Sequence, residues 1–168
     1  MTVLRGFCEH CNKERVLQTE VCMKDYLIKG EVYTVQVAVA ICPHCLTVVP
    51  YEKLDRFQRH AACNAYRRAH GLLTGSQIAG IRTLYGLSQR AMARILGWGR
   101  ITIHRYEQGG IQNRAHDTVM RLAGRDPAFM LKRLELVRVG LSARGYARLR
   151  QSIENGAKWA ARRFARIA

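Results

Sequence analysis

The chain has 168 residues and carries 28 lysine and arginine side chains against 12 aspartates and glutamates, a formal net charge of +16. It contains no run of about 18 apolar residues, and its start lacks a basic stretch followed by an apolar one. We therefore expect neither a membrane span nor a secretory signal, and no membrane partner. In the cytoplasm that this implies, the six cysteines are expected to be metal ligands or free thiols rather than disulfides.

The positive charge is unevenly distributed along the chain. Residues 1–50 hold five basic and five acidic side chains, so the whole excess of +16 follows residue 50. A basic part beside a neutral part predicts a polyanionic partner for the basic part alone.

Two Cys-x-x-Cys motifs with 30 residues between them stand out in the first 50 residues. Each motif can present two thiolates to one ion, and four thiolates complete the tetrahedral shell of a structural Zn²⁺ site. A catalytic zinc keeps one position open for water, which four cysteines do not leave. The predicted metal ligands are Cys8, Cys11, Cys42 and Cys45.

Two histidines and two further cysteines are not assigned to the metal. His10 and His44 lie inside the motifs and are expected to face outward, because four thiolates already complete the shell. Cys22 and Cys63 have no Cys-x-x-Cys partner and are expected to be buried or idle thiols.

The segment between the two motifs has the pattern of a β-hairpin. Residues 32–41 alternate, and the odd-numbered face (from Tyr33 to Ile41) is the more apolar one, as in a half-buried antiparallel strand. Residues 16–28 are predicted to supply the pairing strand or strands, with Lys29-Gly30-Glu31 as the turn. Residues 1–50 are therefore predicted to form a small β-rich domain, to which zinc contributes on the order of 10 kcal/mol of folding free energy.

Residues 51–73 are predicted to be a helical linker. Leu54, Phe57, Ala61 and Ala65 would share one face, and Gly71 would end the helix. The basic side chains of this helix are expected on its other faces, at Arg56, Arg59, Arg67 and Arg68.

Residues 74–139 are predicted to form an all-α domain of five helices. The first covers residues 76–85, the fourth follows Asn113 and is ended by Gly124, and the fifth begins after Asp126-Pro127, a cap followed by proline at the first helical position. In the last two helices we expect Val119, Leu122, Phe129, Leu131, Leu134 and Val137 to point inward.

The second and third of these helices have the pattern of a helix-turn-helix. Ser88 is a natural N-cap, Gly97-Trp98-Gly99 breaks the first helix, and a second helix opens near Arg100 and stops before Gly109-Gly110. Such a unit places the N-terminal end of its second helix in the major groove of double-stranded DNA. The expected DNA-binding residues are Gln89, Arg90, Arg100, Ile101, Thr102, His104 and Arg105.

The last segment, residues 140–168, is predicted to be a basic amphipathic helix. Its apolar stripe would comprise Leu149, Ile153, Ala160, Phe164 and Ile167. Its basic residues are Arg144, Arg148, Arg150, Lys158, Arg162, Arg163 and Arg166, against one acid, Glu154. This helix could follow DNA phosphates, pack on a partner subunit or touch a membrane surface.

The order of these motifs resembles a known family. Leu87-Ser88-Gln89, Leu96-Gly97 and Arg105-Tyr106-Glu107-x-Gly109 are similar to the phage-repressor (XRE) type of helix-turn-helix. Two Cys-x-x-Cys motifs, a strand, a helical linker and then such a domain, over about residues 5–138, resemble the MqsA family of antitoxins, which has an N-terminal zinc domain of the YgiT type.

The resemblance implies a function for each part. The four cysteines would hold a structural zinc, the N-terminal domain would bind a toxin, and the C-terminal domain would form a homodimer on palindromic operator DNA. Arg105 matches the family's base-contacting arginine, whereas Ile101 replaces an asparagine, so a different operator sequence is expected. Residues 141–168 extend beyond the family's usual end.

The expected protein is therefore an α+β, bacterial, nucleoid-associated repressor. It would act as the antitoxin of a type II toxin–antitoxin system, neutralising a toxin and repressing its own operon. One alternative is a regulator of a phage or mobile element, with a structural zinc domain and no toxin. A second is an enzyme, such as a zinc-dependent nuclease or a thiol oxidoreductase. It is not favoured, because the sequence shows neither an open zinc site nor a recognisable nucleophile and base.

Overall fold

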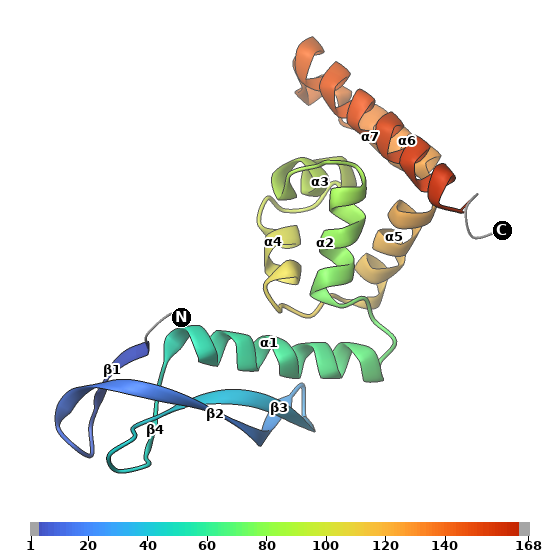
Figure 1. The fold of residues 1–168 in the computed structure, drawn as a ribbon. Helices are drawn as coiled ribbons and strands as arrows, with labels where there is room; N and C mark the ends of the chain where they lie inside the picture. The colour runs from blue at the N-terminus through green and yellow to red at the C-terminus, as the bar shows by residue number, and fades with distance from the viewer. Residues whose placement is uncertain (1–3, 165–168) are drawn as a thin grey trace. The chain divides into compact units, whose positions relative to one another are not determined.

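The computed structural model describes residues 4–164, with side chains placed for residues 4–158. The chain divides into two compact units between Ala69 and His70 (Figure 1). The described part of the first unit holds a four-stranded sheet and one helix, and that of the second unit is helical, so the α+β class is confirmed. No helix in this range combines the length and the apolar character needed to cross a bilayer.

The sheet of the first unit is antiparallel throughout, in the order β1-β2-β3-β4. Its strands are β1 (Leu4–Cys8), β2 (Lys13–Ile28), β3 (Glu31–Ile41) and β4 (Val48–Val49). The β2–β3 hairpin confirms the predicted strands and turn. Lys29 and Gly30 have φ angles of 51° and 87°, and two positive φ angles are what a two-residue type I′ turn requires. Neither β1 nor β4 was predicted.

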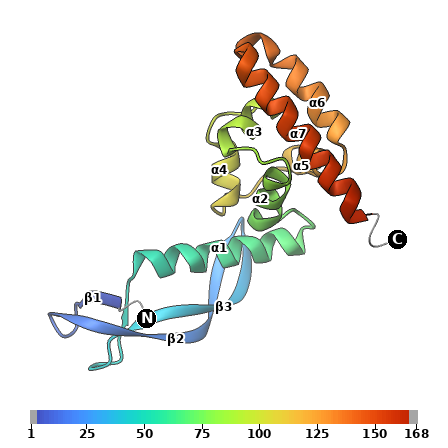
Figure 2. The ribbon, with the colours of Figure 1, turned by 45° about the horizontal axis from the view of Figure 1, so that its top comes forward.

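Helix α1 (Glu52–Ala69) lies along the β2–β3 hairpin (Figure 2). The odd-numbered residues of β3 face it, as the alternation predicts. Val35, Val37, Val39 and Ile41 are buried in one cluster with Ala62 of α1. The segment expected to be a linker therefore packs on the sheet and belongs to the first unit.

The face that α1 turns to the sheet matches the predicted one in part, since Leu54 and Ala65 pack on the sheet. Phe57 is 71% exposed, whereas Gln58 and Arg67 are buried. Burial of these polar groups is tolerated because they are hydrogen-bonded. Gln58 Nε2 donates to the carbonyl of Ala38 (2.8 Å), its Oε1 accepts from Tyr26 (2.6 Å), and Arg67 Nη1 donates to Asn64 (2.8 Å).

The second unit is built of six α-helices and one 3₁₀ helix over the described range. They are α2 (Gly75–Leu84), α3 (Gln89–Leu96), α4 (Thr102–Glu107), α5 (Arg114–Arg125), α6 (Pro127–Leu136), η1 (Arg138–Gly140) and α7 (Ala143–Phe164). Side chains of the residues before α2, α3, α5 and α6 accept hydrogen bonds from backbone amides of the first turns. The caps predicted at Ser88, Asn113 and Asp126 are thus confirmed.

Helix α5 departs from the prediction in two ways. It continues through Gly124 to Arg125, and Gly124 allows Ile81 of α2 to approach: a Cβ there would lie 3.1 Å from an Ile81 side-chain atom. Leu122, expected to be inward, is 42% exposed, while Met120 and Ala123 are buried.

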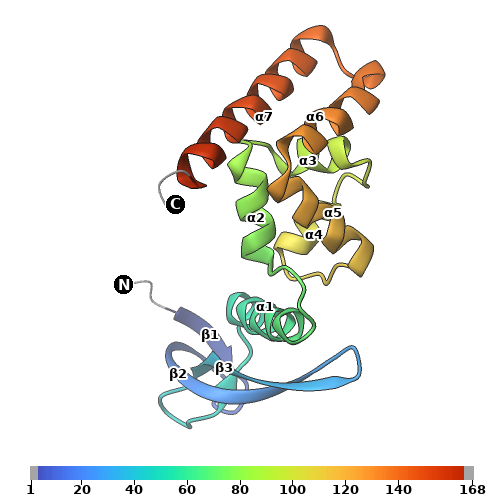
Figure 3. The ribbon, with the colours of Figure 1, turned by 90° about the vertical axis from the view of Figure 1, so that its right-hand side faces the viewer.

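Helix α7 is part of the helical core rather than an appendage. It packs against α6 and α2, and α6 and α7 run side by side (Figure 3). Ile153 is fully buried and Leu149 packs on the same cluster, as the predicted stripe requires, while Arg144, Arg148 and Lys158 are exposed. The side chains of the other predicted stripe and basic residues after Lys158 lie outside the described ones.

Candidate metal centre and nucleic-acid interface

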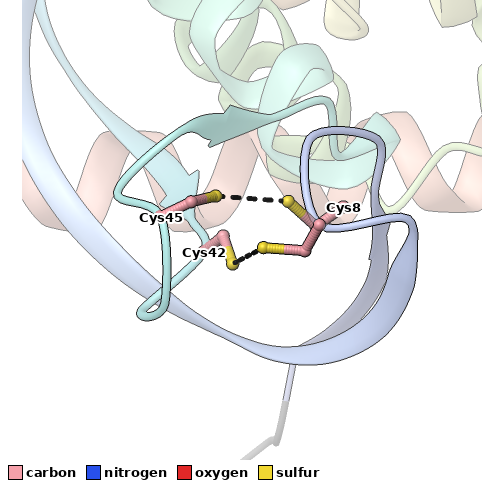
Figure 4. Close-up of side chains that lie close together, drawn as sticks. Cys8, Cys42 and Cys45 are labelled. Atoms are coloured by element: carbon pink, nitrogen blue, oxygen red, sulfur yellow. Dashed lines mark hydrogen bonds between the residues drawn. The ribbon is translucent and has the colours of Figure 1, made fainter.

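Four sulfur atoms converge where the ends of β1 and β3 lie together. The Sγ atoms of Cys8, Cys11, Cys42 and Cys45 all lie within 4.8 Å of one another. Cys8 is 3.5 Å from Cys45, and Cys11 is 3.9 Å from Cys42 (Figure 4). Four sulfurs held at 2.3 Å around a tetrahedral ion are about 3.8 Å apart, so the spacing fits a four-coordinate metal such as zinc.

The two Cys-x-x-Cys loops share one backbone feature. In each, the residue after the second cysteine is left-handed: Asn12 has a φ of 51° and Leu46 a φ of 59°. The second loop is closed by hydrogen bonds from Leu46 N to the carbonyl of Cys42 (2.8 Å) and from Cys42 N to that of Thr47 (3.0 Å). These turns aim both thiols of each loop at the same point.

The protein environment favours thiolate at the second loop. Hydrogen bonds from the side chain and backbone of Thr47 lower the pKa of Cys45 to about 5, and the backbone amide of Cys45 lowers the pKa of Cys42. In the first loop, hydrogen bonding to Cys45 and burial raise the pKa of Cys11 to about 12. Thiols gathered this closely share protons that a bound cation would displace.

The remaining thiols and one loop histidine are placed as follows. Cys22 is exposed on β2 and Cys63 is half-buried on α1, so of the two alternatives, buried or idle, Cys22 is not buried. Cys63 contributes to no metal cluster within residues 4–158. His44 is exposed, as expected, and its Nδ1 lies 3.6 Å from Cys11 Sγ.

In the second unit, α3 and α4 are two short helices joined by a turn, in the segment where the sequence predicts a helix-turn-helix. Ser88 accepts from the amide of Ala91, and α3 ends at Gly97, whose φ of 75° is the left-handed conformation that favours glycine. Trp98 N then donates to the carbonyl of Ala93 (2.8 Å). Helix α4 begins at Thr102, two residues after the predicted start, and buries Ile103 in the core.

The side chains expected to meet DNA lie mostly on the surface. Arg90, Arg100, Ile101, His104 and Arg105 are exposed, and Gln89 and Thr102 are half-buried. Ile101, His104 and Arg105 are spaced i, i+3 and i+4 and therefore share one face of α4. Gln89, in the first turn of α3, reaches that face through a hydrogen bond to His104.

A buried ion pair, which the sequence analysis did not predict, joins α4 to α2. Arg82 of α2 donates from Nε and Nη2 to the two carboxylate oxygens of Glu107 (2.6 and 3.1 Å). Only 8% of the Glu107 side chain is exposed. Gln89 Nε2 donates to the same carboxylate (2.7 Å). The sequence holds no local signal for this pairing, because its partners are 25 and 18 residues apart.

An aromatic cluster fixes the turn. Trp98 stacks on His116 of α5 with ring centroids 4.1 Å apart, and the Tyr106 hydroxyl is 2.7 Å from His116 Nδ1. Tyr106 also meets both rings edge-on. The turn, α4 and the first turn of α5 are thereby held together.

Comparison with known families supports the resemblance seen in the sequence. A family model described as "Antitoxin component of bacterial toxin-antitoxin system, MqsA" matches residues 6–133. The chain belongs to the MqsA antitoxin family. Comparison with curated proteins gave no match.

Membership in the MqsA family implies an antitoxin of a bacterial toxin–antitoxin system, with a toxin as partner. Antitoxin regulators of this kind are generally not enzymes. The match covers the cysteine loops and α1 to α5 and ends within α6, so η1 and α7 lie beyond it.

Proposed function

We propose that this chain is an autoregulating antitoxin that binds operator DNA as a homodimer through its helical unit and neutralises a toxin through its N-terminal unit. The observation that carries the proposal is the α3–turn–α4 unit with Ile101, His104 and Arg105 exposed on one face. In this arrangement Arg105 suits a guanine edge and Ile101 a thymine methyl group. Two such units on a palindrome would read half-sites one helical turn apart.

The N-terminal unit offers a different kind of surface. On the β2–β3 hairpin, register places Val21, Met23 and Leu27 on the same side as Val32, and each is at least 63% exposed. This side, which we call the open hairpin face, is opposite to the one that α1 covers. The exposed Asp25–Thr34 pair lies among these residues. Exposed apolar residues gathered on one side of a sheet are typical of protein-binding surfaces, so we assign the toxin to the open hairpin face.

The role proposed for the metal is structural. Cys8, Cys11, Cys42 and Cys45 would hold Zn²⁺, and the ion would supply folding free energy to a unit with a small core. The four thiols join the β1–β2 loop to the β3–β4 loop. A bound ion would therefore link the two loops beside the small apolar cluster of Leu17, Ala40 and Val49.

Two measurements on the full chain test the proposal. DNA from upstream of the chain's own gene should compete for binding far better than random DNA, and the product of the neighbouring gene should copurify in fixed stoichiometry and be toxic alone. Specific DNA binding without a toxic partner would leave a repressor of a phage or mobile element. Absence of both would refute the proposal.

A further inference from the structure

His104 ends a chain of hydrogen bonds that begins in the core of the helical unit. The chain runs from Arg82 to Glu107, from Glu107 to Gln89, and from Gln89 to the imidazole of His104. Each link constrains which atom of the next group donates. The inference below rests on the proposed DNA-binding function.

The first constraint fixes the orientation of the Gln89 amide. The Glu107 carboxylate is ionised, because both of its oxygens accept from the Arg82 guanidinium. An ionised carboxylate only accepts hydrogen bonds, so the Gln89 group 2.7 Å from Glu107 Oε2 is the NH₂ group. The amide oxygen of Gln89 therefore points to His104.

The second constraint fixes the tautomer of His104. Gln89 Oε1 is 3.2 Å from His104 Nδ1, and a carbonyl oxygen can only accept. Nδ1 must then carry the hydrogen. In a neutral imidazole this leaves Nε2 with a lone pair and no proton.

The unprotonated Nε2 of His104 is available to accept a hydrogen bond from a ligand. His104 is exposed on the face of α4 that also carries Ile101 and Arg105. Within residues 4–158, no protein group is hydrogen-bonded to Nε2 of His104. In the neutral imidazole, Nε2 is thus a hydrogen-bond acceptor on the surface proposed to enter the major groove.

We infer that His104 is a specificity-determining residue that selects a base with an amino group in the major groove. Cytosine N4 and adenine N6 are the two such donors, whereas guanine O6 and N7 and thymine O4 are acceptors and would meet a lone pair. An unconstrained histidine could present either a donor or an acceptor. The hydrogen bond that His104 Nδ1 donates to Gln89 removes that freedom, so His104 would recognise amino groups.

The tautomer is measured without DNA. Side-chain ¹⁵N NMR of the full chain is recorded at about pH 8.5, above the usual titration range of histidine, and His104→Ala identifies the His104 signals. We expect a protonated Nδ1 and a bare Nε2, and a loss of this preference in Gln89→Met, which removes the acceptor at similar size. A proton on Nε2 in the wild-type chain would overturn the inference, whether or not the chain binds DNA.

Base preference is measured by selecting bound sequences from a random duplex library with the wild-type chain, His104→Ala and Arg125→Ala. The control Arg125 is exposed on α5, away from α4 in sequence. We expect the wild-type chain to require cytosine or adenine at one position of each half-site, and His104→Ala to lose about tenfold in affinity and accept any base there. Arg125→Ala should keep the wild-type preference. A guanine or thymine preference that depends on His104 would overturn the inference while leaving DNA binding intact.

Discussion

Gly156 of α7 lies directly against the carbonyl oxygen of Leu84 at the end of α2: a Cβ at position 156 would come within 2.5 Å of that oxygen. The same Cβ would lie 2.7 Å from the ring of Tyr85. Because backbone cannot move aside cheaply, α7 can cross α2 here only without a side chain. At this crossing Ile153, three residues before Gly156, is buried in the core.

Gly156→Ala is therefore expected to destabilise the helical unit by about 1–3 kcal/mol, despite the higher helix propensity of alanine. Gly80→Ala is the matched control, because Gly80 is exposed within α2 and a Cβ there meets nothing within 4 Å. That substitution should stabilise by about 0.5–1 kcal/mol. Urea unfolding followed by circular dichroism measures both. Stabilisation by Gly156→Ala would contradict the close crossing.

Removal of the Glu107 carboxylate is expected to destabilise the helical unit. Glu107→Ala leaves the guanidinium of Arg82, 18% exposed, without its bidentate partner, and the free energy of unfolding should fall by about 3 kcal/mol. The surface pair Arg56–Glu52 is the control, because Glu52→Ala at an exposed site should change stability by less than about 1 kcal/mol. Equal effects of the two substitutions in denaturant titrations would show that the Arg82–Glu107 pair is not structural.

Asp117 is expected to make the helical unit sensitive to acid. Burial alone would raise its pKa, but hydrogen bonds from the Leu73 amide, Gln112 and Arg121 together lower the pKa below the ordinary 3.8. A depressed pKa contributes stability that is complete above 3.8 and is lost as the pH falls through the folded-state value.

Two measurements separate this contribution from general acid effects. Asp117→Asn should cost about 1–3 kcal/mol at neutral pH, because the new NH₂ group meets donors. Its stability should also decline less than that of the wild-type unit in thermal unfolding scans as the pH falls from 3.8 through the lower folded-state pKa of Asp117. Parallel declines of the two chains would exclude Asp117 as the source.

Loss of one metal ligand should unfold one unit and spare the other. Cys42→Ser is expected to release bound zinc and to remove the β-sheet signal, since metal binding and folding are coupled in such sites. The matched control is Cys22→Ser, at an exposed thiol outside the cluster. Metal content and circular dichroism are the readouts, with DNA binding by the same sample as a third. Retained zinc at full stoichiometry in Cys42→Ser would refute a four-cysteine site.

Arg105→Ala is expected to weaken binding to the selected operator by about 1–3 kcal/mol and to relax one base position. Binding to random DNA should change far less, since base contacts rather than phosphate contacts specify sequence. Fluorescence anisotropy with both DNAs separates the two effects. An equal loss on random DNA would assign Arg105 to the phosphates instead.

Patterns that depend on nearest neighbours in sequence predicted much of this structure. The alternation of residues 32–41, the cap at Ser88 and the two cysteine motifs each report local geometry, and each was confirmed. The approach of the four thiols could be predicted because zinc chemistry demands it.

The predictions that failed concern contacts between residues that are far apart in the sequence. Phe57 looked like a core residue and is exposed, while Gln58 is buried because the Ala38 carbonyl and the Tyr26 hydroxyl satisfy it. The role of Gly156 likewise follows only once α2 and α7 are placed together. For the same reason the hydrogen bonds that set the tautomer of His104 could not be anticipated, since Glu107 and Gln89 meet only in the folded unit.

The stacking of Trp98 on His116 supplies an optical probe at the turn between α3 and α4. The chain has only two tryptophans. Replacing Trp159 with phenylalanine would therefore leave a single indole fluorophore between α3 and α4. Its emission would report, without any attached dye, a disturbance of the turn by DNA binding or by unfolding.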